Sequence, residues 1–233
     1  KIHALSVEFG FSIIEDASHA IGARYKGNPV GNCEFSDITV FSFHPVKIVT
    51  TAEGGVVTTN DAAIAQKLDL LRSHGITRNA ELMSEPSHGG WYYEQVDLGF
   101  NYRMTDMQAA LGVSQMSRLH DFVSKRNMLA ERYDTLLKNL PLTTPFQLKE
   151  SLSSRHLYII RLKLDEIALS HKEVFEQLRE NGIGANLHYI PVHLHPYYRD
   201  LGFRKGKFNI AESYYSDAIS IPLFHSMTLN QQD

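Results

Sequence analysis

Residues 38–60 read ITVFSFHPVKIVTTAEGGVVTTN, and this stretch decides the fold. Its first six residues are mostly β-branched or aromatic, which is the composition of a buried strand. A His-Pro pair ends that strand, because proline cannot donate a hydrogen bond to a sheet ladder. The TTAEGG turn follows, and residues 56–59 begin a second strand. Lys47 is therefore expected in a tight loop at the end of a buried strand, among apolar and hydroxyl residues.

The surroundings of Lys47 suggest chemistry as well as structure. Loss of solvation disfavours the charged form of a lysine and makes its free amine available for Schiff-base formation. A lone loop lysine is far more often an ordinary surface residue. Three companions favour the functional interpretation here: Ser42 at the strand end, the Gly54-Gly55 pair that permits close backbone approach to a ligand, and Asp16 upstream.

Asp16 follows a short apolar segment, residues 11–14, that is expected to be a strand. In open α/β sheets, ligands bind beyond the carboxyl ends of the strands, so an acid at this position is well placed for function. A helix-capping aspartate explains the same position equally well. His19, in the small-residue segment that follows, is on its own best explained as a hydrogen-bonded core histidine.

The composition excludes several classes of protein. The chain has 233 residues, 43% hydrophobic and 21% charged, with a net charge of −3, as in an ordinary globular protein. It has no basic cluster for nucleic acid or an anionic membrane, and no apolar run long enough to span a bilayer. The single cysteine, Cys33, excludes an internal disulfide and fits a reducing cytoplasm, where we expect the protein to act.

The element pattern predicts two domains. Residues 1–120 are expected to form part of a large domain, and residues 121–233 a small α/β domain, with one long helix at about 105–140 bridging the two. The first residues already look helical, and the last look like a helix start, so we expect a piece of a longer protein. The other expected helices are 1–9, 62–73, 171–180 capped by Ser170, and 210–216 capped by Asn209; the other expected strands are 156–164, 183–189 and 219–222.

Two further groups of side chains remain open to interpretation. Trp91 and Tyr92 follow a polar loop, and they belong either to a satellite core or to a ligand wall. His188, His193 and His195 lie close together in sequence, but their spacing fits no common zinc motif and no cysteine accompanies them. We therefore expect no metal site.

The motifs together resemble a known family. IIEDASHA, SFHPVK, TTAEGG and LGFNYRMTDMQAALG are similar, in this order, to motifs of the DegT/DnrJ/EryC1/StrS aminotransferases, and the resemblance covers nearly the whole chain. It implies an α/β fold, that of pyridoxal-phosphate-dependent transferases of the aspartate-aminotransferase type (fold type I), acting on nucleotide-linked keto sugars. SFHPVK, RSHGI and LHYIPVHLHPYY most resemble the branch that aminates a UDP-linked 4-keto-6-deoxy-N-acetylhexosamine on the way to pseudaminic acid.

The resemblance also implies roles for individual residues. Lys47 would bind the cofactor as a Schiff base and later move a proton, and Asp16 would pair with the pyridinium nitrogen. His19 would lie near the ring, and Ser42 would donate to the phosphate. Asn101 would reach the cofactor phosphate of the adjacent subunit, which makes a homodimer part of the expectation. The residues expected to meet the sugar nucleotide are Trp91, Tyr92, His188, Tyr189 and Tyr197.

Three alternatives stay open at this point. Relatives that use the same cofactor for dehydration carry a histidine in place of the lysine, so Lys47 favours amination, with an amino acid such as glutamate as donor. The family's glycine-containing helix start and its ring-stacking aromatic residue are not found in this chain. The second alternative is therefore that the chain is a catalytically incomplete fragment, which folds or dimerises without activity. A nucleotide-binding oxidoreductase is disfavoured by the absence of a G-x-G-x-x-G stretch.

Overall fold

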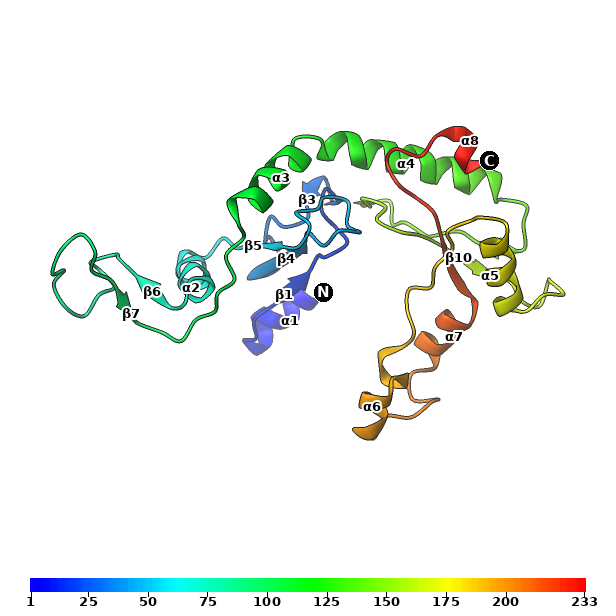
Figure 1. Cartoon of the computed structure of the whole chain (residues 1–233). Helices are drawn as coiled ribbons and strands as arrows, with labels where there is room; N and C mark the ends of the chain where they lie inside the picture. The colour runs from blue at the N-terminus through cyan, green and yellow to red at the C-terminus, as the bar shows by residue number, and fades with distance from the viewer. The chain divides into compact units, whose positions relative to one another are not determined.

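The computed structural model describes all residues from 1 to 233 and divides the chain into two compact units, Lys1–Leu119 and His120–Asp233 (Figure 1). Each unit has its own small sheet and its own apolar core. None of the helices combines the length and the hydropathy needed to cross a bilayer.

The sheet of the first unit has the strand order β1-β4-β5, with bounds Ile14–Asp16, Ile38–Ser42 and Gly55–Thr58. β1 and β4 are parallel, with Asp16 opposite Val40, and β4 and β5 are antiparallel, with Ser42 opposite Gly55. The two strands predicted around Lys47 are thus confirmed. A side chain is excluded at Gly55, because a Cβ there would lie 2.7 Å from the carbonyl oxygen of Phe41.

The strand predicted at residues 11–14 begins later than expected, at Ile14. The pairing with β4 sets this position, because β4 itself begins at Ile38, opposite Ile14. The preceding Ile13 donates its N–H to Asp37 Oδ2 at 2.7 Å. Asp16 consequently is the last residue of the strand rather than a residue that follows it.

The helices of the first unit carry clear end signals. α1, Ile2–Phe9, ends at Gly10 in the left-handed conformation with φ 70°. α2, Ala62–Arg72, begins where the Asp61 side chain accepts a hydrogen bond from the N–H of Ile64. α3, Asp106–Met116, begins with a Thr105–Gln108 capping box. The short strands of this unit are β2 (Arg24–Tyr25), β3 (Asn28–Pro29), β6 (Ile76–Thr77) and β7 (Glu94–Gln95).

The single long helix expected at about 105–140 is wrong. The structure has two helices, because α3 ends at Met116 and α4 spans Leu119–Leu136. At the break, the carbonyl oxygen of Ser114 accepts hydrogen bonds from Ser117 Oγ at 2.9 Å and from Arg118 Nε at 3.3 Å. Side chains that bond to the backbone in this way compete with the helical ladder.

The core of the second unit forms between α4 and an antiparallel sheet of order β11-β10-β8. β10, Tyr158–Leu162, pairs with β11, Ala218–Ile221, and with β8, Leu142–Thr143. Leu129, Tyr158 and Ile219 are fully buried there. α5, His171–Glu180, begins with the predicted Ser170 cap, which forms a capping box with Glu173. The remaining elements are β9 (Ser151–Leu152), η1 (Val192–Leu194), α6 (Pro196–Asp200), α7 (Asn209–Asp217) and α8 (Leu229–Gln232).

Two expectations for the second unit are wrong. The strand expected at 183–189 is reduced to one bridge between Asn186 and Ser220. The adjacent hydrogen-bonded position of the ladder would place Gly184 opposite Pro222, which has no N–H to donate. Asn209, expected to cap the following helix, is its first residue, and Phe208 occupies the cap position without a side-chain bond.

Candidate active site

Asp16 and Lys47 come to the same edge of the first sheet because β1 and β4 are parallel. Asp16 is the last residue of β1, and Lys47 lies in the turn that follows the end of β4 at Ser42. Their charges act on one another: that of Lys47 lowers the pKa of Asp16, and that of Asp16 raises the pKa of Lys47. The acid and the amine therefore lie close enough for their charges to interact, and they are called the Asp16–Lys47 pair below.

The Asp16 carboxylate is held ionised by its neighbours. Its Oδ1 accepts hydrogen bonds from the Ser18 hydroxyl and, at 3.0 Å, from the Ser18 backbone N–H. These two bonds lower the pKa of Asp16 below its ordinary value, and the charges of His19 and Lys47 lower it further. A carboxylate held in this way suits a role as the anionic partner of a cation.

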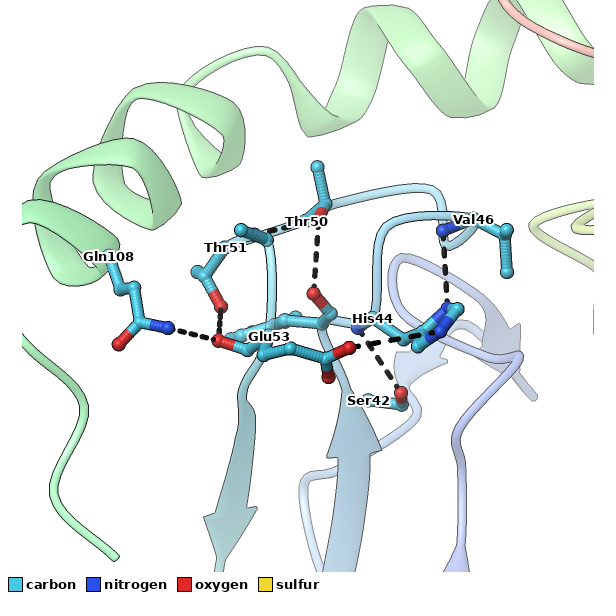
Figure 2. Close-up of polar contacts among 9 residues, drawn as sticks. Ser42, His44, Val46, Thr50, Thr51, Glu53 and Gln108 are labelled. Carbon is cyan, nitrogen blue, oxygen red and sulfur yellow. Dashed lines mark hydrogen bonds and ion pairs between the residues drawn. The ribbon is translucent and has the colours of Figure 1, made fainter.

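The Lys47 turn is anchored by its backbone and by buried neighbours. The N–H of Lys47 donates to the carbonyl oxygen of His44 at 2.9 Å. The N–H of Val46 donates to His44 Nδ1 at 3.4 Å, as Figure 2 shows. Ile48 and Val49 follow, and the side chain of Val49 is fully buried. The position of Lys47 is thus fixed from both sides while its own side chain is only half-buried.

The rest of the loop is closed by hydroxyl groups and by α3. Thr50 Oγ1 donates to the carbonyl oxygen of Phe43 at 3.1 Å (Figure 2). The carbonyl oxygen of Glu53 accepts from Thr51 Oγ1 at 2.8 Å and from Gln108 Nε2, on α3, at 3.0 Å. The TTAEGG segment, which the sequence marked only as a turn, therefore ties the Lys47 loop to a helix.

Partial burial changes the chemistry of Lys47. Desolvation lowers the pKa of its amine below the ordinary value, and the opposing effect of Asp16 is smaller. A larger share of the neutral, nucleophilic amine is therefore present near neutral pH than in a solvated lysine.

Ser42 and His19 lie beside this pair, and Asn101 lies elsewhere in the unit. The hydroxyl oxygen of Ser42 accepts the N–H of His44 at 3.4 Å, so its own proton can point to a ligand (Figure 2). His19 is close enough for its charge to act on Asp16. Asn101 forms a backbone bridge with Ser73, and its expected role concerns a second copy of the chain.

The aromatic residues after the polar loop are not a satellite core. Trp91 is 75% exposed, and the Tyr92 hydroxyl donates to Glu94 Oε1 at 2.9 Å. Sequence reasoning missed Glu94 altogether. Its other partners, Ser84 and Glu85, lie about ten positions upstream, and no local pattern links a glutamate to them.

The expected substrate residues of the second unit have varied surroundings. His188 Nδ1 lies 2.6 Å from Ser220 Oγ, and the Tyr189 ring stands edge-on to the imidazole and is 62% exposed. Tyr197, on α6, is 70% exposed. His193, one of the three clustered histidines, is bound to Glu212 at 2.8 Å, which gives it a structural partner.

Comparison with protein families identifies the chain. The family model of the DegT/DnrJ/EryC1/StrS aminotransferases matches residues 1–233. The chain belongs to this family. It is 37% identical over 235 residues to the spore coat polysaccharide biosynthesis protein SpsC of Bacillus subtilis, covering 100% of this chain and 60% of SpsC. It is 37% identical over 230 residues to the UDP-4-amino-4,6-dideoxy-N-acetyl-beta-L-altrosamine transaminase of Campylobacter jejuni, covering 98% of this chain and 58% of the transaminase.

Solved structures of family members confirm the expected α/β fold of the PLP-dependent aminotransferases. Helicobacter pylori PseC, an aminotransferase involved in the biosynthesis of pseudoaminic acid, matches with a TM-score of 0.88 at 33% identity, over 99% of this chain and 59% of PseC. The PLP form of Spr1654, a putative sugar aminotransferase from Streptococcus pneumoniae, matches with a TM-score of 0.84 at 31% identity, over 98% of this chain and 57% of Spr1654. This family member thus spans about three-fifths of the length of its relatives.

Proposed function

We propose that the chain is the lysine-bearing part of a pyridoxal-phosphate-dependent aminotransferase that moves an amino group from an amino acid, expected to be glutamate, to C4 of a nucleotide-linked 4-keto-6-deoxy sugar. The observation that carries the proposal is the Asp16–Lys47 pair at one sheet edge in a member of this family. The names of the Campylobacter and Helicobacter relatives support a sugar precursor of the pseudaminic acid type, and SpsC supports a polysaccharide precursor more generally.

The side chains present fit pyridoxal phosphate. Lys47 offers an amine with a lowered pKa, Asp16 an ionised carboxylate, and Ser42 a hydroxyl whose oxygen is already bonded to the backbone. When bound, the cofactor supplies an aldehyde that carries the amino group and a ring that withdraws electrons from the carbon being deprotonated. The aldehyde thus requires an amine such as that of Lys47, the ring nitrogen a carboxylate such as that of Asp16, and the phosphate a donor such as the Ser42 hydroxyl.

Each residue then has a role that follows from its surroundings. With the cofactor bound, Lys47 Nζ would hold it through its aldehyde, and the freed amine would serve as the base and acid that move a proton at carbon. Asp16 remains ionised at neutral pH because its pKa is lowered, so it can hold a proton on a ring nitrogen placed against it. Ser42 would donate to the phosphate, and His19 would be a hydrogen-bonding neighbour of the ring.

The proposal extends to assembly and domain roles. Asn101 would reach the cofactor phosphate of a second copy, so the active form would be a homodimer with shared sites. Residues 1–120 would be the cofactor-binding part, and residues 121–233 the small domain, which contributes His188, Tyr189 and Tyr197 to the substrate. A cytoplasmic site of action is supported by the single cysteine, Cys33.

Borohydride reduction tests the proposal. The chain is mixed with pyridoxal phosphate, reduced, digested and mapped by mass spectrometry, with Lys47→Ala as the variant and Lys67→Ala as a control on an exposed lysine of the same unit. We expect one stoichiometric adduct on Lys47, absent in Lys47→Ala and unchanged in Lys67→Ala. An adduct that persists in Lys47→Ala contradicts the assignment.

The incomplete fragment is the second candidate. All three residues of β1 are exposed, Asp16 among them, so the acid is open to water on this chain. Incubation of the unreduced, cofactor-loaded chain with glutamate, followed by the change in absorbance, separates the candidates. An adduct without transamination supports the fragment, and amino-group transfer supports the complete reaction.

A further inference from the structure

Residues 78–93 form a long connection between two short paired strands. β6 and β7 are antiparallel, with Thr77 opposite Glu94 and Ile76 opposite Gln95. Glu94 is therefore the first residue after the connection, at the point where the chain returns to its starting position (Figure 1). A connection of this length, with only a two-residue ladder at its base, needs further contacts to hold one conformation.

The Glu94 carboxylate supplies those contacts. Its Oε2 accepts the Ser84 N–H and the Ser84 hydroxyl, both at 2.7 Å. Its Oε1 accepts the Glu85 N–H and the Tyr92 hydroxyl, both at 2.9 Å. Both oxygens are thus used twice, and they join the middle of the connection to its end. Because these bonds favour the ionised form, the pKa of Glu94 falls to about 2.

The same contacts determine where the aromatic rings lie. The Tyr92 ring packs against the His88 ring at a tilt of 31°, with a centroid distance of 4.6 Å. The N–H of Tyr92 donates to the carbonyl oxygen of Gly89 at 2.9 Å, closing a turn around Trp91. Gly89 has a φ of 153°, and a Cβ there would lie 2.6 Å from the Trp91 ring. The indole thus lies against the glycine, while 75% of Trp91 stays exposed.

We propose that Glu94 is a positioning residue, which holds residues 84–92 so that the Trp91 ring is a fixed stacking face for the planar base of the nucleotide-linked substrate. The inference rests on the proposed function for the identity of the substrate. An exposed aromatic ring stacks on any base through its π face, and a ring fixed beforehand loses little conformational freedom on binding. Glu94 itself touches no substrate.

Trp91 is the only tryptophan of the chain, so its fluorescence reports on this loop alone. In Glu94→Gln, an amide NH2 group replaces one of the two carboxylate oxygens and then faces a hydrogen-bond donor of the loop. The loop therefore loses part of the hydrogen bonding that holds it. The matched control is Glu81→Gln, which removes a carboxylate from the same loop but keeps the backbone N–H through which Glu81 bonds to Asn79 Oδ1 at 3.0 Å. We expect lower fluorescence anisotropy of Trp91 in Glu94→Gln and an unchanged value in Glu81→Gln. Unchanged anisotropy in Glu94→Gln overturns the positioning role.

Titration with UDP tests the stacking face, and ribose 5-phosphate, which has no base, is the comparison ligand. We expect UDP to quench Trp91 in the unsubstituted chain, ribose 5-phosphate to leave it unchanged, and the UDP midpoint to rise about tenfold in Glu94→Gln. The base site is overturned if UDP does not quench Trp91, or if both ligands quench it equally. It is also overturned if Glu94→Gln lowers the anisotropy of Trp91 but leaves the UDP midpoint unchanged.

These outcomes are separate from the proposed function. The adduct on Lys47 is measured without a nucleotide, so a failed UDP titration beside a normal adduct removes the base site alone. An absent adduct beside normal UDP quenching removes the cofactor assignment alone. In the catalytically active protein, Glu94→Gln should raise KM about tenfold and leave kcat within about twofold, because the substitution weakens binding of a part remote from the reacting carbon.

Discussion

The first unit contains two loops, around Lys47 and at residues 78–93, that are held in different ways. The Lys47 loop is closed by backbone bonds, with the N–H of Phe43 bonded to Gly54 at 2.8 Å and the N–H of Thr51 bonded to Phe43 at 3.0 Å, above the fully buried Val49. In the loop of residues 78–93, by contrast, one carboxylate, that of Glu94, accepts hydrogen bonds from Ser84, Glu85 and Tyr92. The Lys47 loop thus has several backbone supports, whereas one carboxylate makes four of the bonds that hold the aromatic loop.

The largest expected effect tests the acid of the catalytic pair. Asp16→Asn should lower kcat about a thousandfold, because the amide cannot stabilise a cation on a ring nitrogen. The pKa of Lys47 should fall further, since the charge of Asp16 now raises it. Stopped-flow transamination gives the rate, and the pH dependence of adduct formation gives the pKa.

The control for Asp16→Asn is the preceding residue. Glu15 accepts a hydrogen bond from Thr39 Oγ1 at 3.2 Å, and consecutive strand residues point to opposite faces. Glu15→Gln should leave both the rate and the pKa of Lys47 unchanged. A rise in the pKa of Lys47 in Asp16→Asn would contradict the pairing.

The next expected effect concerns the buried side chain of Val49, which anchors the Lys47 loop. Val49→Ala should lower the free energy of unfolding by about 2 kcal/mol, because it leaves a cavity at a fully buried site. Val46→Ala, in the same loop but 65% exposed, should change it by less than about 0.5 kcal/mol. Urea unfolding measures both values. Similar losses in the two variants would show that the loop is not anchored through Val49.

The smallest expected effect is the pH dependence of the aromatic loop, which Glu94 holds. Folding lowers the pKa of Glu94 from 4.5 to about 2. Glu94 therefore stabilises the loop fully at pH values above 4.5, and this stabilisation is lost as the pH falls through the folded value of about 2. The anisotropy of Trp91 should therefore stay level as the pH passes 4.5 and fall near 2. A midpoint close to 4.5 would mean that Glu94 is not bonded as described.

Local signals explain what the sequence predicted well. The capping box of α5 and the glycine stop of α1 lie within a few residues of the features they determine. The strand ending at Ser42 was predicted for the same reason, from its own composition and the proline after it. Asp16 was identified as a candidate by its place after an apolar segment, although the end of the strand was misplaced.

What the sequence did not predict depends on distant partners. The break at residues 117–118 arises from side-chain bonds to Ser114, which a continuous apolar stripe does not reveal. The strand expected at 183–189 is missing because Pro222, far along the chain, has no N–H to pair with Gly184. Glu94 acquires its importance from Ser84 and Glu85, across a loop that carries no periodic pattern. The expected roles of Asn101, Tyr189 and Tyr197 stay predictions.

The parallel pairing of β1 with β4 has a consequence for how this protein folds. Ile14 lies opposite Ile38, so the whole segment between them must be closed as a loop before a single rung of the ladder forms. The turn around Lys47 needs only its own neighbours and can form early. The Lys47 amine should therefore acquire its acidic neighbour late, at the step when the sheet closes, and only from that step does the charge of Asp16 raise its pKa.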